Sequence, residues 1–391
     1  MPLPNTHTHT HTHTALIETH NSKEASFTLG HNEFSDMTHA EFRERMGLGE
    51  FAIGLDLEQI MKPRRYYNFM NFEEGEEPKD EEDDHVANNL LLRGSNMEPS
   101  AAAAAMTERR HLPSNANNNE EEDLGCDWHA RGLIGPIRQQ GQCGACWAFS
   151  AIGAIESAMA IDKFNSMPPA EREDPKLTLG LVTPLSEQDL IDCDKKFEKG
   201  CKGGLMTTTF NEEEKSGRGI CSEADYPYLE TQGTCSNDSC TPVEGSVVRD
   251  QVDVVPRKTH ALEKAVRVQP VTAAMVANDP MFQFYSKGIY QMDGCGRVTK
   301  EMGDPECGIL YDDQDVCIPD INHGVLVVGY GIEESATSSI KKYFKVKNSW
   351  GSSWGEGGFF RIARYDEDKT DPLENWGECA ILTLLSYPVM K

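Results

Sequence analysis

Apolar residues recur every three or four positions through residues 146–161, CWAFSAIGAIESAMAI, which is the spacing of a helix with a buried apolar side. The residues on this spacing are Trp147, Phe149, Ile152, Ile155 and Met159. Further along, LSEQDLIDC places Ser186 directly before Glu187, a typical helix N-terminus. This part of the chain is therefore predicted to be helical.

The pattern changes in the last part of the chain. Residues 325–331 (VLVVGYG), 341–350 (KKYFKVKNSW) and 357–365 (GGFFRIARY) are β-branched and aromatic runs interrupted by glycine. Such runs are typical of strands. A helical half followed by an antiparallel sheet half predicts an α+β fold.

The hydrophobic pattern is lost before residue 124. Residues 1–14, MPLPNTHTHTHTHT, contain no apolar segment of the kind a signal peptide needs. The repeat's alternating histidines could hold a metal loosely, but we expect a disordered tract and no metal site. Residues 15–50 could form a short helical unit, and residues 51–123 are predicted to be an acidic, Asn-rich linker that includes EEGEEPKDEEDD.

All twelve cysteines of the 391-residue chain fall in residues 124–391, so we place the folded domain there. Its helical half is expected at about 124–240 and its sheet half at about 241–391. This many cysteines favours disulfides and an oxidising compartment. The formal net charge of −27 argues against nucleic acid and anionic membranes as partners, and the sequence has no apolar run of membrane-spanning length.

The stretch QGQCGACWAFS contains two cysteines, Cys143 and Cys146, separated by two residues. A redox pair would need a βαβ context, and the preceding sequence has no such strand. A zinc site would need a second closely spaced pair, whereas Cys193 and Cys201 are eight positions apart. We therefore favour Cys146 as a nucleophile at a helix N-terminus, where the helix dipole favours the thiolate, with Cys143 as a structural neighbour.

A thiolate nucleophile needs a base and a residue that orients the base. The two histidines after Cys146 are His260, in a polar stretch, and His323, directly before a predicted strand, so we favour His323. Asn348 follows another strand and could accept the imidazole N–H, while Trp350 shields the pair. The side chain of Gln140 could donate to an oxyanion together with the backbone N–H of Cys146.

These residues resemble the papain-like cysteine peptidases, in their cathepsin L-like branch. The segment CGACW at 143–147 fits the family signature, and LSEQDLIDCD, GCKGGLM, NHGVLVVGYG and KNSWGSSWGEGGFFRI follow in the family's order. The resemblance implies a papain-like two-domain fold, with a helical left domain carrying Cys146, an antiparallel β-barrel-like right domain carrying His323 and Asn348, and a cleft between them. It also implies a monomeric cysteine endopeptidase that acts through an acyl-enzyme on proteins and peptides without a cofactor, in a lysosome, in a vacuole or outside the cell.

The chain departs from the family in its spacing. His323 and Asn348 follow Cys146 by 177 and 202 residues, whereas about 130 to 150 is usual. Polar insertions at 164–180 and 296–315 account for the difference. The second insertion lies just before His323, so we expect it to influence which substrates enter.

The resemblance also implies pairings and subsites. It pairs Cys143 with Cys201 and Cys193 with Cys235, whereas Cys295, Cys307 and Cys317 compete for Cys379, with Cys295 favoured. We also predict a bridge between Cys221 and Cys240. The implied substrate-binding residues are Gly203, Gly204, Leu205, Met206, Ala274, Gly324, Trp350 and Leu384. The subsite for the second residue before the scissile bond is apolar, which predicts Leu, Phe or Val there and not Arg.

The segment LGHNEFSDMTHAEF at 29–42 resembles the inhibitory propeptide of these enzymes, with Gly30, Asn32, Phe34 and Asp36 at its motif positions. The front half of that propeptide is replaced by the Thr-His repeat. We expect acid to assist maturation by protonating carboxylates such as Asp36. A catalytically inactive, peptide-binding or inhibitory homologue is the alternative, but Cys146, His323, Asn348 and Gln140 are all present.

Overall fold

The computed structural model describes residues 6–23, 25–48, 125–172, 174, 178–196, 198–236, 238, 240–292, 295, 310–311, 314–317, 321–333, 342–366 and 376–391. Residues 6–12 and 310–317 are described by their backbone alone. The predicted linker at 51–123 and most of the insertion at 296–315 lie outside the described residues. All described residues belong to a single compact unit.

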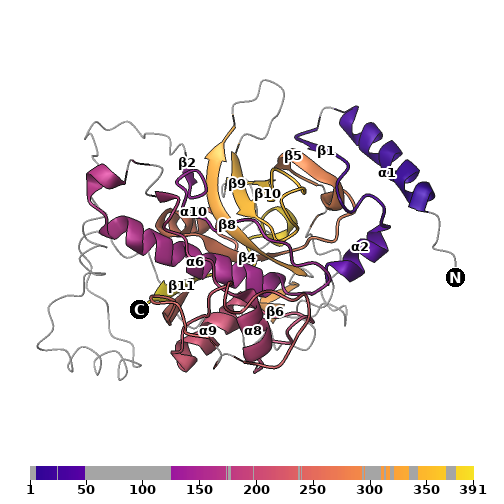
Figure 1. Ribbon diagram of the computed structural model, residues 1–391. Helices are drawn as coiled ribbons and strands as arrows, with labels where there is room; N and C mark the ends of the chain where they lie inside the picture. The colour runs from indigo at the N-terminus through magenta and orange to yellow at the C-terminus, as the bar shows by residue number, and fades with distance from the viewer. Residues whose placement is uncertain are drawn as a thin grey trace, which may run out of the picture. The chain divides into compact units, whose positions relative to one another are not determined.

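The helical half is built around α6 (Cys146–Ser166), and every residue from Cys146 to Ile161 is buried. The shorter helices α8 (Glu187–Cys193) and α9 (Met206–Ser216) lie below it in Figure 1. Ser186 caps α8 by accepting a 3.0 Å hydrogen bond from the backbone N–H of Asp189. The predicted helices and the N-terminus at Ser186 are confirmed.

The sheet half contains one nine-stranded sheet with the order β1-β5-β10-β9-β8-β4-β11-β3, and β2 pairs with β8. Its strands are β1 (Phe27–Leu29), β2 (Gly125–Asp127), β3 (Val248–Asp253), β4 (Val271–Met275), β5 (Tyr285–Tyr290), β8 (His323–Ile332), β9 (Lys342–Lys347), β10 (Phe359–Ala363) and β11 (Leu384–Met390). All pairs are antiparallel except β5 with β10. The α+β class is confirmed, although the described strands follow an open path and include one parallel pair.

The remaining elements are short. Helix α10 (Thr259–Val268) packs beside β8 and β4, and β6 (Leu310–Tyr311) pairs with β7 (Gln314–Cys317) in a separate ribbon. Single 3₁₀ turns occur at η1 (Pro169–Glu171), η3 (Phe282–Phe284) and η5 (Glu378–Ala380). Among the described residues, none of the helices combines the length and apolar character needed to cross a bilayer.

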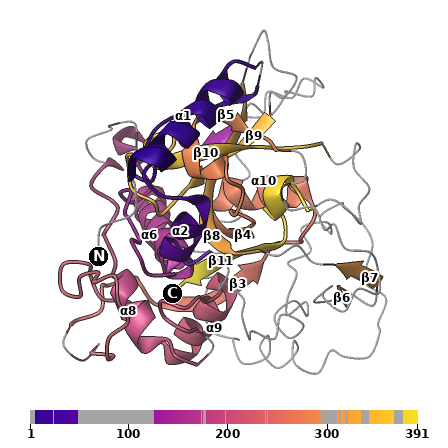
Figure 2. The same ribbon diagram turned by 90° about the vertical axis from the view of Figure 1, so that its right-hand side faces the viewer.

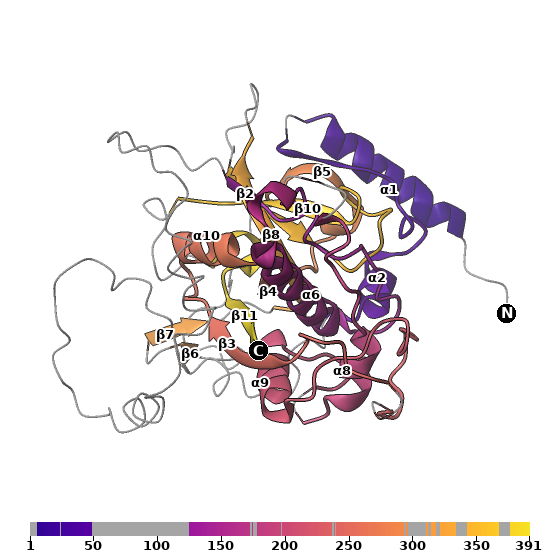
Figure 3. The same cartoon turned by 60° about the vertical axis from the view of Figure 1, so that its left-hand side comes forward.

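The two halves meet where α6 packs against β8, as Figures 1 and 3 show. The Ser150 hydroxyl donates a 2.6 Å hydrogen bond to the carbonyl of Val325. One turn further along α6, a Cβ at Gly153 would lie 3.1 Å from Leu326, so the glycine allows the helix to approach the strand closely. This packing determines how the start of α6 lies relative to the start of β8.

The N-terminal unit, residues 6–48, consists of α1 (Thr6–Asn21), β1 and α2 (His39–Arg45). Strand β1 extends the large sheet by pairing with β5, with Phe27 opposite Gly288. Figure 2 shows α1 beside β5 and α2 near the start of α6. The unit is therefore part of the same packed structure as residues 125–391.

The prediction of a disordered repeat at residues 1–14 was wrong from Thr6 onward, where α1 begins. The prediction weighed local composition alone, whereas tertiary contacts stabilise this helix. The His13 ring packs 4.6 Å from the ring of Phe284, and its Nδ1 lies 3.0 Å from the carbonyl of Ser35. Ile17 and His20, on the following turns, are buried.

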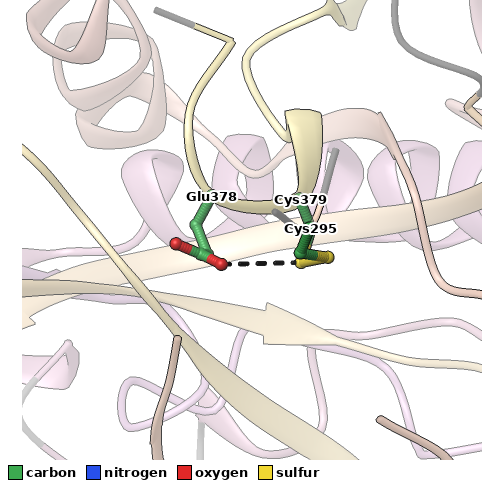
Figure 4. Close-up of side chains that lie close together, drawn as sticks. All are labelled: Cys295, Glu378 and Cys379. Atoms are coloured by element: carbon green, nitrogen blue, oxygen red, sulfur yellow. Dashed lines mark hydrogen bonds between the residues drawn. A yellow bond between two sulfur atoms is a disulfide. The ribbon is translucent and has the colours of Figure 1, made fainter. Parts of the chain in front are cut away.

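The described residues contain four disulfides. Three of them are the pairs favoured from the resemblance, and Cys221–Cys240 is the pair that was predicted separately. The four bridges are Cys143–Cys201, Cys193–Cys235, Cys221–Cys240 and Cys295–Cys379. Figure 4 shows Glu378 beside the last of them. Because both sulfurs of that pair are bonded to each other, only the carboxylate remains as a metal ligand, so this group does not form a metal site.

Candidate active site

Cys146 is the first residue of α6, and its side chain is buried. Its position is fixed from the preceding residues, since Cys143 is bonded to Cys201 and the backbone N–H of Gly144 donates a 2.9 Å hydrogen bond to the Cys201 carbonyl. The Trp147 indole N–H donates a 3.0 Å hydrogen bond to the carbonyl of Gly200. These contacts hold the start of α6 against the loop at 199–204.

His323 is the first residue of β8, and Asn348 directly follows the paired strand β9. The imidazole Nε2 lies 2.8 Å from Asn348 Oδ1, and the ring of Trp350 lies 4.8 Å from the imidazole. An amide oxygen only accepts hydrogen bonds, so Nε2 carries the proton and Nδ1 is the basic nitrogen. Nδ1 is buried and has no hydrogen-bond partner among the described residues.

The residue after His323 contacts the nucleophile's backbone. A Cβ at Gly324 would lie 3.3 Å from both the carbonyl carbon and the carbonyl oxygen of Cys146, so a side chain there would require the backbone of Cys146 to shift by a few tenths of an ångström. The structure therefore brings Cys146, His323 and Asn348 together from opposite halves of the chain. His260 lies elsewhere, on α10.

In the intact chain Cys146 and His323 both favour their neutral forms. Burial raises the pKa of the Cys146 thiol to about 11, and hydrogen bonds from the backbone N–H groups of Gly324 and Trp147 offset this only in part. Burial also lowers the pKa of His323 to about 4, against the opposing effect of its bond to Asn348. The expectation that the helix N-terminus favours the thiolate is thus not met while the site is covered.

Gln140 is fully buried, and its side chain has a defined orientation. Its Oε1 accepts a 2.7 Å hydrogen bond from the Ser349 hydroxyl, which turns Nε2 toward the carbonyls of Cys143, at 3.0 Å, and Met46, at 3.2 Å. Met46 belongs to the N-terminal unit. The donor expected to stabilise an oxyanion is therefore already bonded to a backbone carbonyl of the same chain.

The segment at 46–48 covers the residues around Cys146. Met46 and Leu48 are buried, and a Cβ at Gly47 would lie only 2.6 Å from Cα of Gly144. Sequence reasoning missed these three residues, although the glycine between two large apolar residues directly after the propeptide-like motif was a usable signal.

The N-terminal unit is anchored beside the site mainly by aromatic and amide contacts. Phe42 packs 5.1 Å from Trp350, and Asn32 donates a 2.7 Å hydrogen bond to the Gln283 carbonyl. Asp36, expected to hold the unit together, is exposed. The Glu33 carboxylate instead accepts a 2.6 Å hydrogen bond from Gln139, the neighbour of Gln140.

The residues expected to form the apolar subsite lie next to one another. Leu384 is opposite Ala274 across β11 and β4, and Ala274 is opposite Gly324 across β4 and β8. Met206, at the start of α9, places its sulfur 3.1 Å from where a Cβ of Gly324 would be, and Leu205 before it is buried. Each of these side chains is apolar.

A cluster of buried charges lies behind Asn348, around a small cavity. Arg138 donates a 3.0 Å hydrogen bond to Glu156 and also bonds Glu187. Burial raises the pKa of Glu187 to about 8 despite the opposing charge of Arg138, and burial lowers the pKa of Lys347 in the same cavity wall. Asn348 therefore borders a cavity that is lined by charged side chains from both halves of the chain.

Comparisons with known proteins agree with this geometry. Residues 124–389 match the papain family cysteine protease model, and residues 11–42 match the cathepsin propeptide inhibitor domain. Procathepsin L of Mus musculus is 38% identical over 268 residues, 68% of this chain and 65% of its own length. The thiol protease SEN102 of Hemerocallis sp. is 36% identical over 263 residues, 67% of this chain and 59% of its own length, so the matched region spans about three fifths of these relatives.

Solved structures show the same similarity. The proform of the ragweed pollen cysteine protease Amb a 11 superimposes with a TM-score of 0.64 at 26% identity, covering 100% of this chain and 90% of that chain. A recombinant stem bromelain precursor gives a TM-score of 0.63 at 28% identity, covering 98% of this chain and 90% of that chain.

Replacing Gly47 with alanine is expected to weaken the cover over Cys146. The new Cβ would clash with Gly144 Cα at 2.6 Å, in addition to the strain of a side chain at φ +63°. In the full-length chain, we expect iodoacetamide to react with Cys146 about tenfold faster in this variant than in wild type. This ratio corresponds to a loss of ~1.4 kcal/mol in the free energy that keeps the site covered. The control is Gly217→Ala, which has a similar φ of +59° and no atom within 4 Å. Equal labelling rates in both variants would contradict this account.

The pH dependence of that labelling provides a second prediction. Because burial holds the pKa of Cys146 at about 11, the intact chain should react slowly at neutral pH and faster as pH rises toward that value. Removing the N-terminal unit re-exposes the site to water, so the reaction should become fast at neutral pH. An identical pH profile before and after removal would show that the N-terminal unit does not cause the shift.

Proposed function

Because the chain belongs to the papain family of cysteine proteases, we propose that it is a cysteine endopeptidase made as a proenzyme, with Cys146 as nucleophile and His323 as general base. One observation carries this proposal. His323 Nε2 lies 2.8 Å from Asn348 Oδ1, which leaves Nδ1 as the basic nitrogen, while Gly324 beside it contacts the backbone of Cys146. The base is thus oriented by an amide, and we infer that its Nδ1 serves the thiol of Cys146.

The proposed reaction is an acyl transfer in two steps. His323 Nδ1 accepts the thiol proton, the sulfur attacks the peptide carbonyl carbon, and the oxyanion accepts hydrogen bonds from Gln140 Nε2 and the Cys146 backbone N–H. The imidazolium then gives its proton to the leaving amine, and a thioester on Cys146 remains. Water attacks this acyl-enzyme while His323 accepts its proton, and the acid product and the thiol are released.

In the proenzyme, we propose that the N-terminal unit acts as the inhibitor. The Met46 carbonyl occupies the hydrogen bond from Gln140 Nε2 that an oxyanion would accept, and Gly47 packs directly on Gly144. Cleavage within residues 51–123 would release the enzyme at 124–391. A monomeric enzyme in a lysosome, in a vacuole or outside the cell is consistent with four disulfides and with the family.

We further propose that substrates bind in an extended conformation along Gly203 and Gly204, the proposed substrate wall, and that Trp350 lies on the other side of the nucleophile. The second residue before the scissile bond would contact the row formed by Leu384, Ala274 and Gly324. This row offers no charge to pair with a guanidinium. Preference for Leu, Phe or Val over Arg follows, because burying an unpaired cation costs several kcal/mol.

Active-site titration with a thiol-directed epoxide tests the reaction. We expect one label per matured molecule, located on Cys146 by mass spectrometry, and a loss of peptide turnover of about a thousandfold or more in Cys146→Ser. Cys126→Ser is the control, because this cysteine is also buried but its sulfur contacts the Val266 carbonyl at 3.9 Å. A folded, matured protein that neither takes the label nor turns over peptides would instead support an inactive peptide-binding homologue.

The subsite proposal predicts a switch in specificity. Leu384→Glu introduces a carboxylate beside Ala274 and should raise kcat/KM for an Arg peptide relative to a Leu peptide by about tenfold or more, as expected for a charged hydrogen bond of ~1.5 kcal/mol. The matched control is Leu384→Gln, which has the same shape without the charge. If both variants give the same ratio of Arg to Leu turnover, Leu384 does not line this subsite.

A further inference from the structure

Two acidic side chains are buried near the proposed substrate wall and lie within hydrogen-bonding reach of each other. Asp194 and Glu198, in the loop after α8, are only 5% and 4% exposed. Neither carboxyl oxygen of Asp194 has a hydrogen-bond partner among the described residues, and Glu198 Oε2 has none either. Glu198 Oε1 accepts a hydrogen bond from the Thr208 hydroxyl on α9.

Two ionised carboxylates are not stable in this position. Burial raises the pKa of both groups, and the charge of Glu198 raises that of Asp194 further. Among the described ion pairs, neither carboxyl has a cationic partner. The acids that face the pair from α9 are Glu212 and Glu213, and both add to the unfavourable field at Asp194.

The cations that pair with Glu212 and Glu213 form no described ion pair with Asp194 or Glu198. Lys215 and Lys196 lie 2.8 Å and 3.4 Å from Glu212. Arg218 lies 3.9 Å from Glu213 and 3.0 Å from Asp189, on α8. A proton is therefore the simplest way to neutralise one charge of the Asp194 and Glu198 pair.

We propose that Asp194 and Glu198 share one proton, so that one carboxyl donates a hydrogen bond to the other and holds the proposed substrate wall in place. The pair acts on the wall through packing. A Cβ at Gly204 would lie 2.8 Å from Glu198 Cγ and 2.7 Å from the Trp147 indole, so the backbone of Gly204 is clamped between these side chains. The loop is closed by a 2.9 Å hydrogen bond from Lys199 N–H to the Gly203 carbonyl.

Glu198 is thus a positioning residue for the wall and for Trp147, which directly follows the nucleophile. The assignment of Gly203 and Gly204 to substrate binding rests on the proposed function, whereas the shared proton does not.

Because of the shared proton, the stability of the loop should fall as pH rises. The native pair keeps its proton above the pH at which an unfolded carboxyl, with a pKa of about 4, has lost it. The native state then binds more protons than the unfolded state, so stability falls as pH rises until the native pair ionises. Above that point two like charges repel each other in an apolar environment and destabilise the wall.

Thermal unfolding of the full-length chain tests the proposal, in a Cys146→Ala background that prevents self-processing. Wild type should lose Tm steadily from about pH 5 to about pH 9. In Glu198→Gln the amide oxygen still accepts from Thr208 and the amide N–H donates permanently to Asp194. The fall in Tm should therefore be smaller by about 3 °C or more. Glu214→Gln, which removes an exposed acid of the same helix α9, should follow wild type.

If Tm falls as steeply with rising pH in Glu198→Gln as in wild type, the two carboxyls do not share a proton and the proposal is wrong. If that variant does not fold, Asp194→Asn tests the same bond with the donor reversed, and a parallel profile there has the same meaning. Tm is also measured with added CaCl2 and with EDTA at constant pH. A rise with calcium and a fall with chelator would show that a cation neutralises the pair, which also overturns the proposal.

Kinetics of the matured enzyme separate positioning from general stability. In Glu198→Gln a permanent hydrogen bond holds the wall, so KM should increase less at alkaline pH than it does in wild type. The dependence of kcat on pH should be the same in both proteins. An unchanged KM profile would contradict a positioning role. If no turnover exists at all, the proposed function fails, but the Tm experiment still decides the shared proton.

Discussion

The site depends on one packing contact, that of helix α6 against strand β8. The nucleophile candidate begins the helix and the base candidate begins the strand, so neither is useful unless these two ends meet. Ser150 fixes the helix to the Val325 carbonyl, and the glycines at 153 and 324 remove the side chains that would separate the elements. A small shift along this contact would move the thiol away from the imidazole. Correct positioning of reacting groups lowers the activation free energy of a reaction by several kcal/mol.

Burial also controls the protonation of several ionisable side chains in this molecule. Burial raises the pKa of Cys146 and lowers that of His323, so both groups favour their neutral forms in the intact chain. The inhibition that we propose would therefore combine the cover at residues 46–48 with a nucleophile that stays protonated. Burial affects other acids in two ways. Glu187 has Arg138 as a cationic partner, whereas Asp194 and Glu198 have none among the described ion pairs and, in our proposal, share a proton.

Local patterns predicted much of the fold. The structure has the helix predicted from residues 146–161, the helix cap at Ser186 and the strands interrupted by glycine where they were expected. Each of these features depends on burial or on a backbone requirement within a short segment of sequence. The Thr-His repeat shows the limit of this reasoning. Its composition predicts disorder, but contacts of His13 with Phe284 and Ser35, remote in sequence, accompany a helix.

By itself the sequence determined the family, the α+β class and the identity of the candidate catalytic residues, since residue type and order carry that information. The tertiary structure alone decided which groups meet: the hydrogen bond from Gln140 to Met46, the row from Leu384 to Gly324, and the burial of Asp194 with Glu198. It also reversed the expectation of a thiolate at Cys146. Solvation depends on what covers a group in three dimensions, and no local pattern specifies that cover.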